Sequence, residues 1–187
     1  WFGSCSGAPV MGALRLLLRA LAIPQPGAHI QHAATALRNV CARCSRTLLD
    51  PTALTGLMDA TEGVVNAPAS GSALELEDRQ AVVEGLARLV SLLPPADAAP
   101  AAMKLVAPLL HSARALVAAE EGSGGAEAQA DTLADELHLI ASAVRFMEFA
   151  GDGAEGQPHP AVAVVEGVWP VLTAVAEGAR WRSHAGA

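Results

Sequence analysis

Apolar residues recur along this chain at helical spacing, three and four positions apart, in seven separate stretches. The clearest case is the second stretch, where Ile30, Leu37 and Cys41 fall on one helical face. No stretch shows the strict alternation of apolar and polar residues that marks a half-buried strand. We therefore expect an all-α protein. The expected helices cover about residues 9–23, 29–46, 51–67, 73–93, 97–119, 128–149 and 159–177.

Proline residues and one capping residue set several features of these helices. The pair Asp50-Pro51 predicts the start of the third helix, because aspartate is a good N-cap and proline suits the first helical position. The pair Pro94-Pro95 predicts the end of the fourth helix. Pro108 and Pro170 lie inside the fifth and seventh helices, so we expect a kink at each of them.

The helices form pairs, the second with the third, the fourth with the fifth and the sixth with the seventh. The starts of these pairs lie tens of residues apart, close to the spacing of about 40–47 residues in HEAT and armadillo repeats. An α–α superhelix, a solenoid of this type with about three and a half helix pairs, explains the pairing better than a closed bundle does. We expect residues 1–187 to form one piece of such a solenoid.

The seventh helix has an apolar stripe that is expected to face the core. Its members are Val162, Val165, Trp169, Leu172 and Val175. Glu166, Thr173 and Glu177 are expected to face outward.

Composition and charge exclude some classes of function. Hydrophobic residues make up 52% of the 187 positions, which argues against disorder. The net charge of −7 argues against direct nucleic-acid binding, which depends on Lys and Arg, and is compatible with a basic protein partner. No apolar run approaches the roughly 20 residues of a membrane span, so we expect no membrane contact. The odd number of cysteines, three, favours a reducing compartment, and the initial Trp1 suggests a piece of a longer protein.

One cluster of residues could suggest a zinc site. Cys41 and Cys44 form a C-x-x-C pattern, and His29 and His32 lie upstream. If these residues share one helix, His32 and Cys44 are about 18 Å apart, too far for one metal ion. We interpret Cys41 as a small core residue, with a redox or metal role as the alternative.

No pattern in the sequence predicts catalysis. The six histidines are scattered, and none stands at a recognisable spacing from a Ser or Cys nucleophile. Neither glycine-rich loop has the residue order that cradles a phosphate. We therefore expect no enzyme activity, no catalytic residue, no metal and no cofactor, and we keep a helical enzyme domain as a third hypothesis.

The polar sides of the third, fifth and seventh helices form the candidate binding surface. In a solenoid the second helix of each pair usually lines the inner curve, so these sides would share one concave surface that wraps a partner. The alternative is an ordinary solvated face. The candidate residues are Asp59, Glu62, Lys104, His111, Arg114, Glu166 and Glu177.

Two segments carry a resemblance to a known family. The first runs from His159-Pro160 through an apolar stretch to Val168-Trp169-Pro170-Val171-Leu172. It resembles the mid-chain segment of nuclear transport receptors of the importin-β superfamily and is most similar to the transportin-SR and importin-13-like branch. The second segment, Ala33–Cys44, resembles an Ala-rich helix of the same proteins that ends in Asn-apolar-Cys-x-x-Cys. With both segments in matching order, the resemblance spans about Ala8 to Ala179.

The resemblance implies a function that the residue patterns do not. It implies a stack of HEAT repeats in a receptor that carries protein cargo through the nuclear pore, contacts nucleoporins and shuttles between nucleus and cytoplasm. In the most similar branch the cargo includes Arg-Ser-rich splicing factors, and the GTPase Ran releases cargo by binding repeats that lie outside this segment. The alternative is a generic HEAT or armadillo interaction scaffold without transport activity.

Overall fold

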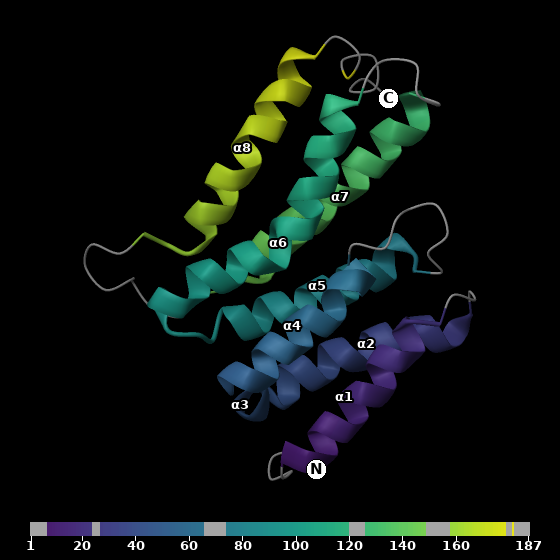
Figure 1. Cartoon of the computed structure of the whole chain (residues 1–187), viewed down its shortest axis with the longest axis vertical. Coiled ribbons are helices and arrows are strands. Elements are labelled where there is room, and N and C mark those ends of the chain that lie inside the picture. The colour runs from purple at the N-terminus through teal and green to yellow at the C-terminus, as the bar shows by residue number, and fades with distance from the viewer. Residues whose placement is uncertain are drawn as a thin grey trace.

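The computed structural model describes residues 7–23, 27–65, 74–119, 126–148 and 158–178, together with Trp181. Within these residues the chain forms α-helices and no strand, so the expected all-α class is confirmed (Figure 1). The helices are α1 (Gly7–Leu21), α2 (Ala28–Arg43), α3 (Ser45–Leu48), α4 (Pro51–Val65), α5 (Leu76–Val90), α6 (Pro95–Ala118), α7 (Ala126–Phe146) and α8 (Ala161–Glu177).

Each expected helix has a counterpart whose ends differ from the expected ones by at most three residues. Residues 66, 67, 73 and 149, at the expected ends, lie outside the described part of the chain. The prediction of a single helix over residues 29–46 is wrong. The helix divides at Cys44, whose φ of −111° and ψ of 22° leave the helical region, and α3 follows as a separate short turn. This break redirects the chain toward α4 while Cys44 and Leu48 both stay buried.

The predicted start of α4 is confirmed by its cap. Asp50 Oδ1 accepts hydrogen bonds from the backbone N–H groups of Thr52 (3.1 Å) and Ala53 (3.0 Å). These bonds satisfy donors that have no partner within the first turn of a helix. A local signal in the sequence therefore fixes where this helix begins.

The helices are arranged in two rows. In the first row α1 contacts α4, α4 contacts α6, and α6 contacts α8. In the second row α2 contacts α5, and α5 contacts α7. Contacts of α1 with α2, α4 with α5, and α6 with both α5 and α7 join the rows. Figure 1 shows α1 and α8 at opposite ends of this stack.

The helix α5 lies at the centre of the core. It contacts α2, α4, α6 and α7, and residues 81–87, 89 and 90 of this helix are all buried. A helix that is covered on nearly every side belongs to the interior of a protein rather than to its surface. Its charged residues therefore need partners inside the fold.

Three prolines lie inside described helices that continue past them. The helix α6 continues through Pro100 and Pro108, and α8 continues through Pro170. Each proline removes one backbone hydrogen bond and crowds the preceding turn. Figure 1 shows α6 changing direction along its length, which brings its second half beside α8.

The prediction of which face of α8 points into the core is wrong. Val164, Val168 and Val171 are the buried residues, and this face lies toward α6. Trp169 is 63% exposed, and three further members of the expected stripe are also exposed. They are Val162 (40%), Val165 (45%) and Leu172 (39%). The helix is apolar on two faces, so helical periodicity alone could not tell which of them α6 covers.

Trp169→Ala is therefore expected to lower the free energy of unfolding by less than about 1 kcal/mol, because an exposed side chain buries little area. Val164→Ala on the covered face of the same helix is expected to cost about 2 kcal/mol. Urea unfolding followed by circular dichroism measures both values. A larger loss for Trp169 than for Val164 would contradict this orientation of α8.

Candidate functional site

All seven candidate residues are exposed and lie on three successive helices of the first row. Asp59 and Glu62 belong to α4, and Glu166 and Glu177 belong to α8. The helix α6, which lies between them, provides Lys104, His111 and Arg114.

The structure joins α4 to α6 through an ion pair between two of these residues. Lys104 Nζ donates to Asp59 Oδ1 at 2.5 Å. The side chains are 44% and 57% exposed, so water screens the attraction and the pair adds about 1 kcal/mol or less to stability. The pair mainly fixes the position of two charges at the edge of the groove between α4 and α6.

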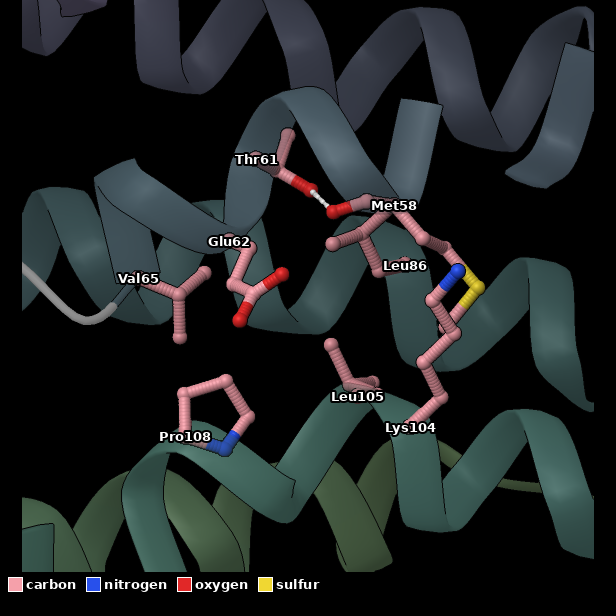
Figure 2. A pocket seen from close by; sticks show the side chains of 8 residues that line it. All are labelled: Met58, Thr61, Glu62, Val65, Leu86, Lys104, Leu105 and Pro108. Carbon is pink, nitrogen blue, oxygen red and sulfur yellow. Dashed lines mark hydrogen bonds between the residues drawn. The ribbon is translucent and has the colours of Figure 1, made fainter. Parts of the chain in front are cut away.

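A shallow pocket lies in this groove (Figure 2). Its lining comes from α4, α5 and α6 and is mostly apolar. The lining residues are Met58, Thr61, Glu62, Val65, Leu86, Lys104, Leu105 and Pro108. The enclosed part of this pocket holds little more than a water molecule, so the pocket is a shallow hollow against which a partner's side chain could lie, and it is too small to be a small-molecule site.

The polar groups of the pocket differ in their availability. The Thr61 hydroxyl donates to the backbone carbonyls of Leu57 (2.8 Å) and Met58 (3.0 Å), so its hydrogen is already used. Figure 2 shows the Glu62 carboxylate pointing into the space between Val65 and Pro108. In the described residues this carboxylate has no hydrogen bond or ion pair. The pocket thus offers an apolar wall and one available negative charge.

Arg114 has a structural contact between α6 and α8. Its Nη2 atom donates to the backbone carbonyl of Gly167 at 2.9 Å. The two helices approach closely there, because a Cβ atom at Gly167 would lie 3.3 Å from both Leu110 Cδ1 and Met103 Cε. Arg114 therefore helps to seat α8 on α6.

The remaining candidates are not drawn together. His111 and Glu166 are exposed and form no hydrogen bond or ion pair with any other residue that the structure describes. Glu177 occupies the last position of α8. The geometry therefore gathers Asp59, Glu62 and Lys104 at one groove and leaves the other four spread along α6 and α8.

The sequence patterns missed a buried ion pair inside the fold. Arg79 on α5 donates from Nη2 to Glu136 Oε1 on α7 at 2.8 Å, and from Nε to the Val65 carbonyl of α4 at 3.0 Å. The two charged side chains are only 7% and 6% exposed, and Glu136 Oε2 has no hydrogen-bond partner. Periodicity gives no signal for such a pair, because it treats charged residues as members of a solvated face.

A second network of polar side chains connects the helices of the second row. Glu84 on α5 accepts from Arg38 Nη1 on α2 (3.2 Å) and from Gln80 Nε2 (3.0 Å). Gln80 Oε1 lies 3.3 Å from His138 Nε2 on α7. These contacts connect α2, α5 and α7, so the charges of this row hold helices together.

The two described cysteines are buried on the stripe that the sequence assigned to packing. Neither Cys41 nor Cys44 forms a disulfide bond with a described residue, and His29 and His32 are exposed. In the described part of the chain no three His, Cys, Asp or Glu side chains come together in a way that could hold a metal ion. Burial raises the pKa of the Cys41 thiol from 9.0 to about 12, so the thiol stays protonated at neutral pH.

Cys41 is expected to resist alkylation in the native protein at pH 8, by about a hundredfold or more relative to the chain in urea, because the thiolate is the reactive form. The folded thiol binds its proton more tightly than the unfolded one, so this group lowers stability as pH rises from 9.0 toward 12 and has no effect below that window. Site-resolved mass spectrometry after iodoacetamide treatment measures the reactivity. Equal labelling of native and unfolded chains would contradict the burial of Cys41.

Among the helices that the structure describes, one passes a simple length and composition test for a membrane span. The helix α6 has 24 residues and a mean hydropathy of 1.2 in its most apolar window, of which 33% is buried. It also contacts α4, α5, α7 and α8. A core helix of a helical stack has the same composition, so this single helix is weak support for a membrane span.

The groove between α4 and α6 brings together Glu62 and the Lys104–Asp59 pair, three of the seven predicted residues, and is therefore the candidate site. Comparison with known proteins adds no assignment to it, because no family model, no curated protein and no solved structure matches the chain.

Proposed function

We propose that this chain is a segment of a HEAT- or armadillo-type solenoid that binds a protein partner along its first row. The contacts along each row and between the rows support this proposal, since a solenoid is built from helix pairs that pack on their neighbours. The exposed candidate residues of α4, α6 and α8 would then follow one another along one surface. The chain would act by binding, without catalysis and without a cofactor.

The groove pocket is the observation that carries the binding proposal. An arginine or lysine of the partner would place its aliphatic stem against Leu105 and Pro108 and its positive charge on the Glu62 carboxylate. A hydrogen bond to a charged group is worth about 1.5–3 kcal/mol, enough to select a basic side chain over an apolar one. The net charge of −7 favours the approach of a basic partner.

We further propose that the parent protein is a nuclear import receptor of the importin-β superfamily, similar to the transportin-SR and importin-13-like branch. Support comes from the resemblance of the segments Ala33–Cys44 and His159–Leu172. In this proposal the cargo includes Arg-Ser-rich proteins, Ran in its GTP form controls release through other repeats, and nucleoporin contacts let the protein shuttle between nucleus and cytoplasm.

Glu62→Gln is expected to weaken binding of a fluorescent Arg-Ser repeat peptide by about tenfold, because it removes the available charge of the pocket. Glu127→Gln, an exposed change on α7 in the second row, is the matched control and should leave binding unchanged. Fluorescence anisotropy at low salt measures both affinities. Equal affinities for the two variants, or equal binding of an Asp-Ser repeat peptide, would remove the pocket from the proposal.

The transport part of the proposal is tested with the full-length parent chain bound to the same peptide on beads. Release of the chain by Ran locked in its GTP form would support an import receptor. Stronger binding with Ran-GTP would indicate an exporter. Binding that does not respond to Ran-GTP would favour the alternative, a generic HEAT or armadillo scaffold.

A further inference from the structure

The last turns of α2, α5 and α7 each contain an exposed arginine. These residues are Arg43, Arg88 and Arg145. Figure 1 shows the three helices running in the same direction, and α5 is in contact with both of its neighbours. Their last turns therefore lie toward one edge of the second row, and this edge carries positive charge.

Two of these arginines contact one aromatic ring. Arg88 Cζ on α5 lies 5.0 Å from the centre of the Phe146 ring, and Arg145 Cζ on α7 lies 5.7 Å from it. Phe146 is half-buried and packs against the hydrophobic core, so the fold fixes the position of its ring. The attraction of a guanidinium group for an aromatic ring then holds both exposed side chains in place at the surface.

Both arginines keep their hydrogen-bond donors available. The N–H groups of a guanidinium lie in its plane, so contact with a ring leaves donors that match the two oxygens of a carboxylate. Along the chain the nearest carboxylates are Glu84, one turn before Arg88, and Glu148, just after α7. Glu84 is bound by Arg38 at 3.2 Å, and Glu148 is exposed. Neither Arg88 nor Arg145 forms an ion pair with any residue in the described ranges.

An exposed apolar residue lies close to these charges. Leu92 follows the end of α5 and is 54% exposed. Its backbone N–H donates to the carbonyl of Leu89 at 3.1 Å, so the chain continues in a turn and places Leu92 about one turn beyond Arg88. Together with the half-buried Phe146, Leu92 offers an apolar contact beside two positive charges.

We propose that Arg88 and Arg145, held by Phe146, form an arginine clamp that binds an acidic peptide segment of a protein partner. Two guanidinium groups at one ring repel each other, and an anion between them removes this repulsion. The apolar contact at Leu92 favours a peptide over a free inorganic anion, because only a peptide carries an apolar side chain beside its carboxylates.

The arginine clamp is a second binding surface and does not rest on the proposed function. The groove in the first row offers a negative charge, whereas the clamp in the second row offers two positive ones. The net charge of −7 opposes the approach of an acidic partner, so the contact must come from this local pair. Salt screens exposed charges, so we expect the affinity to fall as ionic strength rises.

Fluorescence anisotropy of a labelled Glu-Leu repeat peptide mixed with the full chain tests the proposal. Arg88→Gln and Arg145→Gln are each expected to weaken binding by about tenfold, because each removes a charge-assisted hydrogen bond. Phe146→Leu keeps an apolar side chain against the core and removes the aromatic ring, so it should also weaken binding. Circular dichroism establishes that each variant is folded before affinities are compared.

Arg15→Gln, an exposed change on α1 in the first row, is the matched control, because it alters the net charge by the same amount. It should leave the affinity unchanged, and so should Glu62→Gln in the groove, which separates the clamp from the proposed function.

Equal affinities for Arg88→Gln and Arg15→Gln would overturn the proposal, since binding would not then depend on the clamp. So would the absence of binding at near-millimolar peptide, or equally tight binding of a Lys-Leu repeat peptide. Displacement of the peptide by an equal concentration of inorganic phosphate would overturn the assignment to a peptide, because the anion alone would then be the ligand.

Discussion

Arg79→Met is expected to lower the free energy of unfolding by about 3–5 kcal/mol, because it leaves the buried Glu136 carboxylate without its ion-pair partner. Glu136 Oε2 already has no hydrogen-bond partner, so the substitution would leave the whole carboxylate unpaired. The Val65 carbonyl would lose the hydrogen bond from Arg79 Nε as well. A domain of this size is typically stable by only about 5–15 kcal/mol, so this loss would be a large part of the total.

Urea unfolding of the single and double variants measures this effect. Arg79→Met/Glu136→Leu is expected to recover most of the loss, because an apolar pair of similar volume needs no buried charge to be compensated. Lys104→Met is the matched control, since it removes a cation from an exposed pair and should cost about 1 kcal/mol or less. If the double variant were no more stable than Arg79→Met, the unpaired Glu136 carboxylate would cost nothing in the single variant. The carboxylate would then have to be in contact with water.

The same ion pair connects the core to the candidate site. Val65 provides both the carbonyl that accepts from Arg79 and one wall of the groove pocket. Arg79 thereby holds the end of α4 against α5, and Glu136 extends the connection to α7. We expect the pocket to keep its shape only while this buried ion pair is intact. Loss of stability in the second row of helices should therefore also weaken binding at the groove in the first row.

Local signals in the sequence were sufficient for the helical class and for the start of α4, although they did not indicate the break at Cys44. The Asp50 carboxylate caps α4 as the pattern indicated, whereas Pro95, which the pattern assigned to the end of the preceding helix, stands in the first turn of α6. The buried stripe of α4 was also predictable, since Leu54, Leu57 and Val64 all face the core. Such features depend on residues a few positions apart, and a single sequence contains that information.

Features decided by contacts between distant helices were not predictable in the same way. Trp169 was expected in the core because α8 has two apolar faces, and only the position of α6 decides which one is covered. Arg79 and Glu136 are 57 residues apart, and nothing in the pattern of either helix indicates that they meet. Burial of a charge depends on a partner that periodicity cannot identify.

The candidate site was predicted in part. The polar side of α4 and α6 was identified, and the structure joins Asp59 to Lys104 there. The apolar wall was missed, because Leu105 has the pattern of an ordinary core residue and Pro108 that of a helix kink. A pocket arises from an imperfect fit between helices, and the spacing along one helix does not describe that fit.

Gly85→Val is expected to lower the free energy of unfolding by about 3 kcal/mol, because α2 and α5 approach each other too closely for a larger side chain. A Cβ atom at Gly85 would lie 3.0 Å from Arg38 Cα and 3.4 Å from both Cys41 Cβ and Cys41 Sγ. The nearest atom belongs to the backbone of α2, so the strain cannot be relieved by rotating a side chain. The two methyl groups of valine would force the helices apart and disturb the Arg38–Glu84 pair next to this position.

Gly56→Val on α4 is the matched control, because a Cβ atom there meets nothing within 4 Å. The control should change stability by no more than about 0.5 kcal/mol, as for an ordinary surface substitution. Gly85→Ala should fall between the two, since one methyl group causes less crowding and alanine favours the helix by about 1 kcal/mol over glycine. Urea unfolding of all three variants gives the order directly. If Gly85→Val were as stable as Gly56→Val, α2 and α5 would have to lie farther apart, and the second row could not be packed as tightly as its buried residues require.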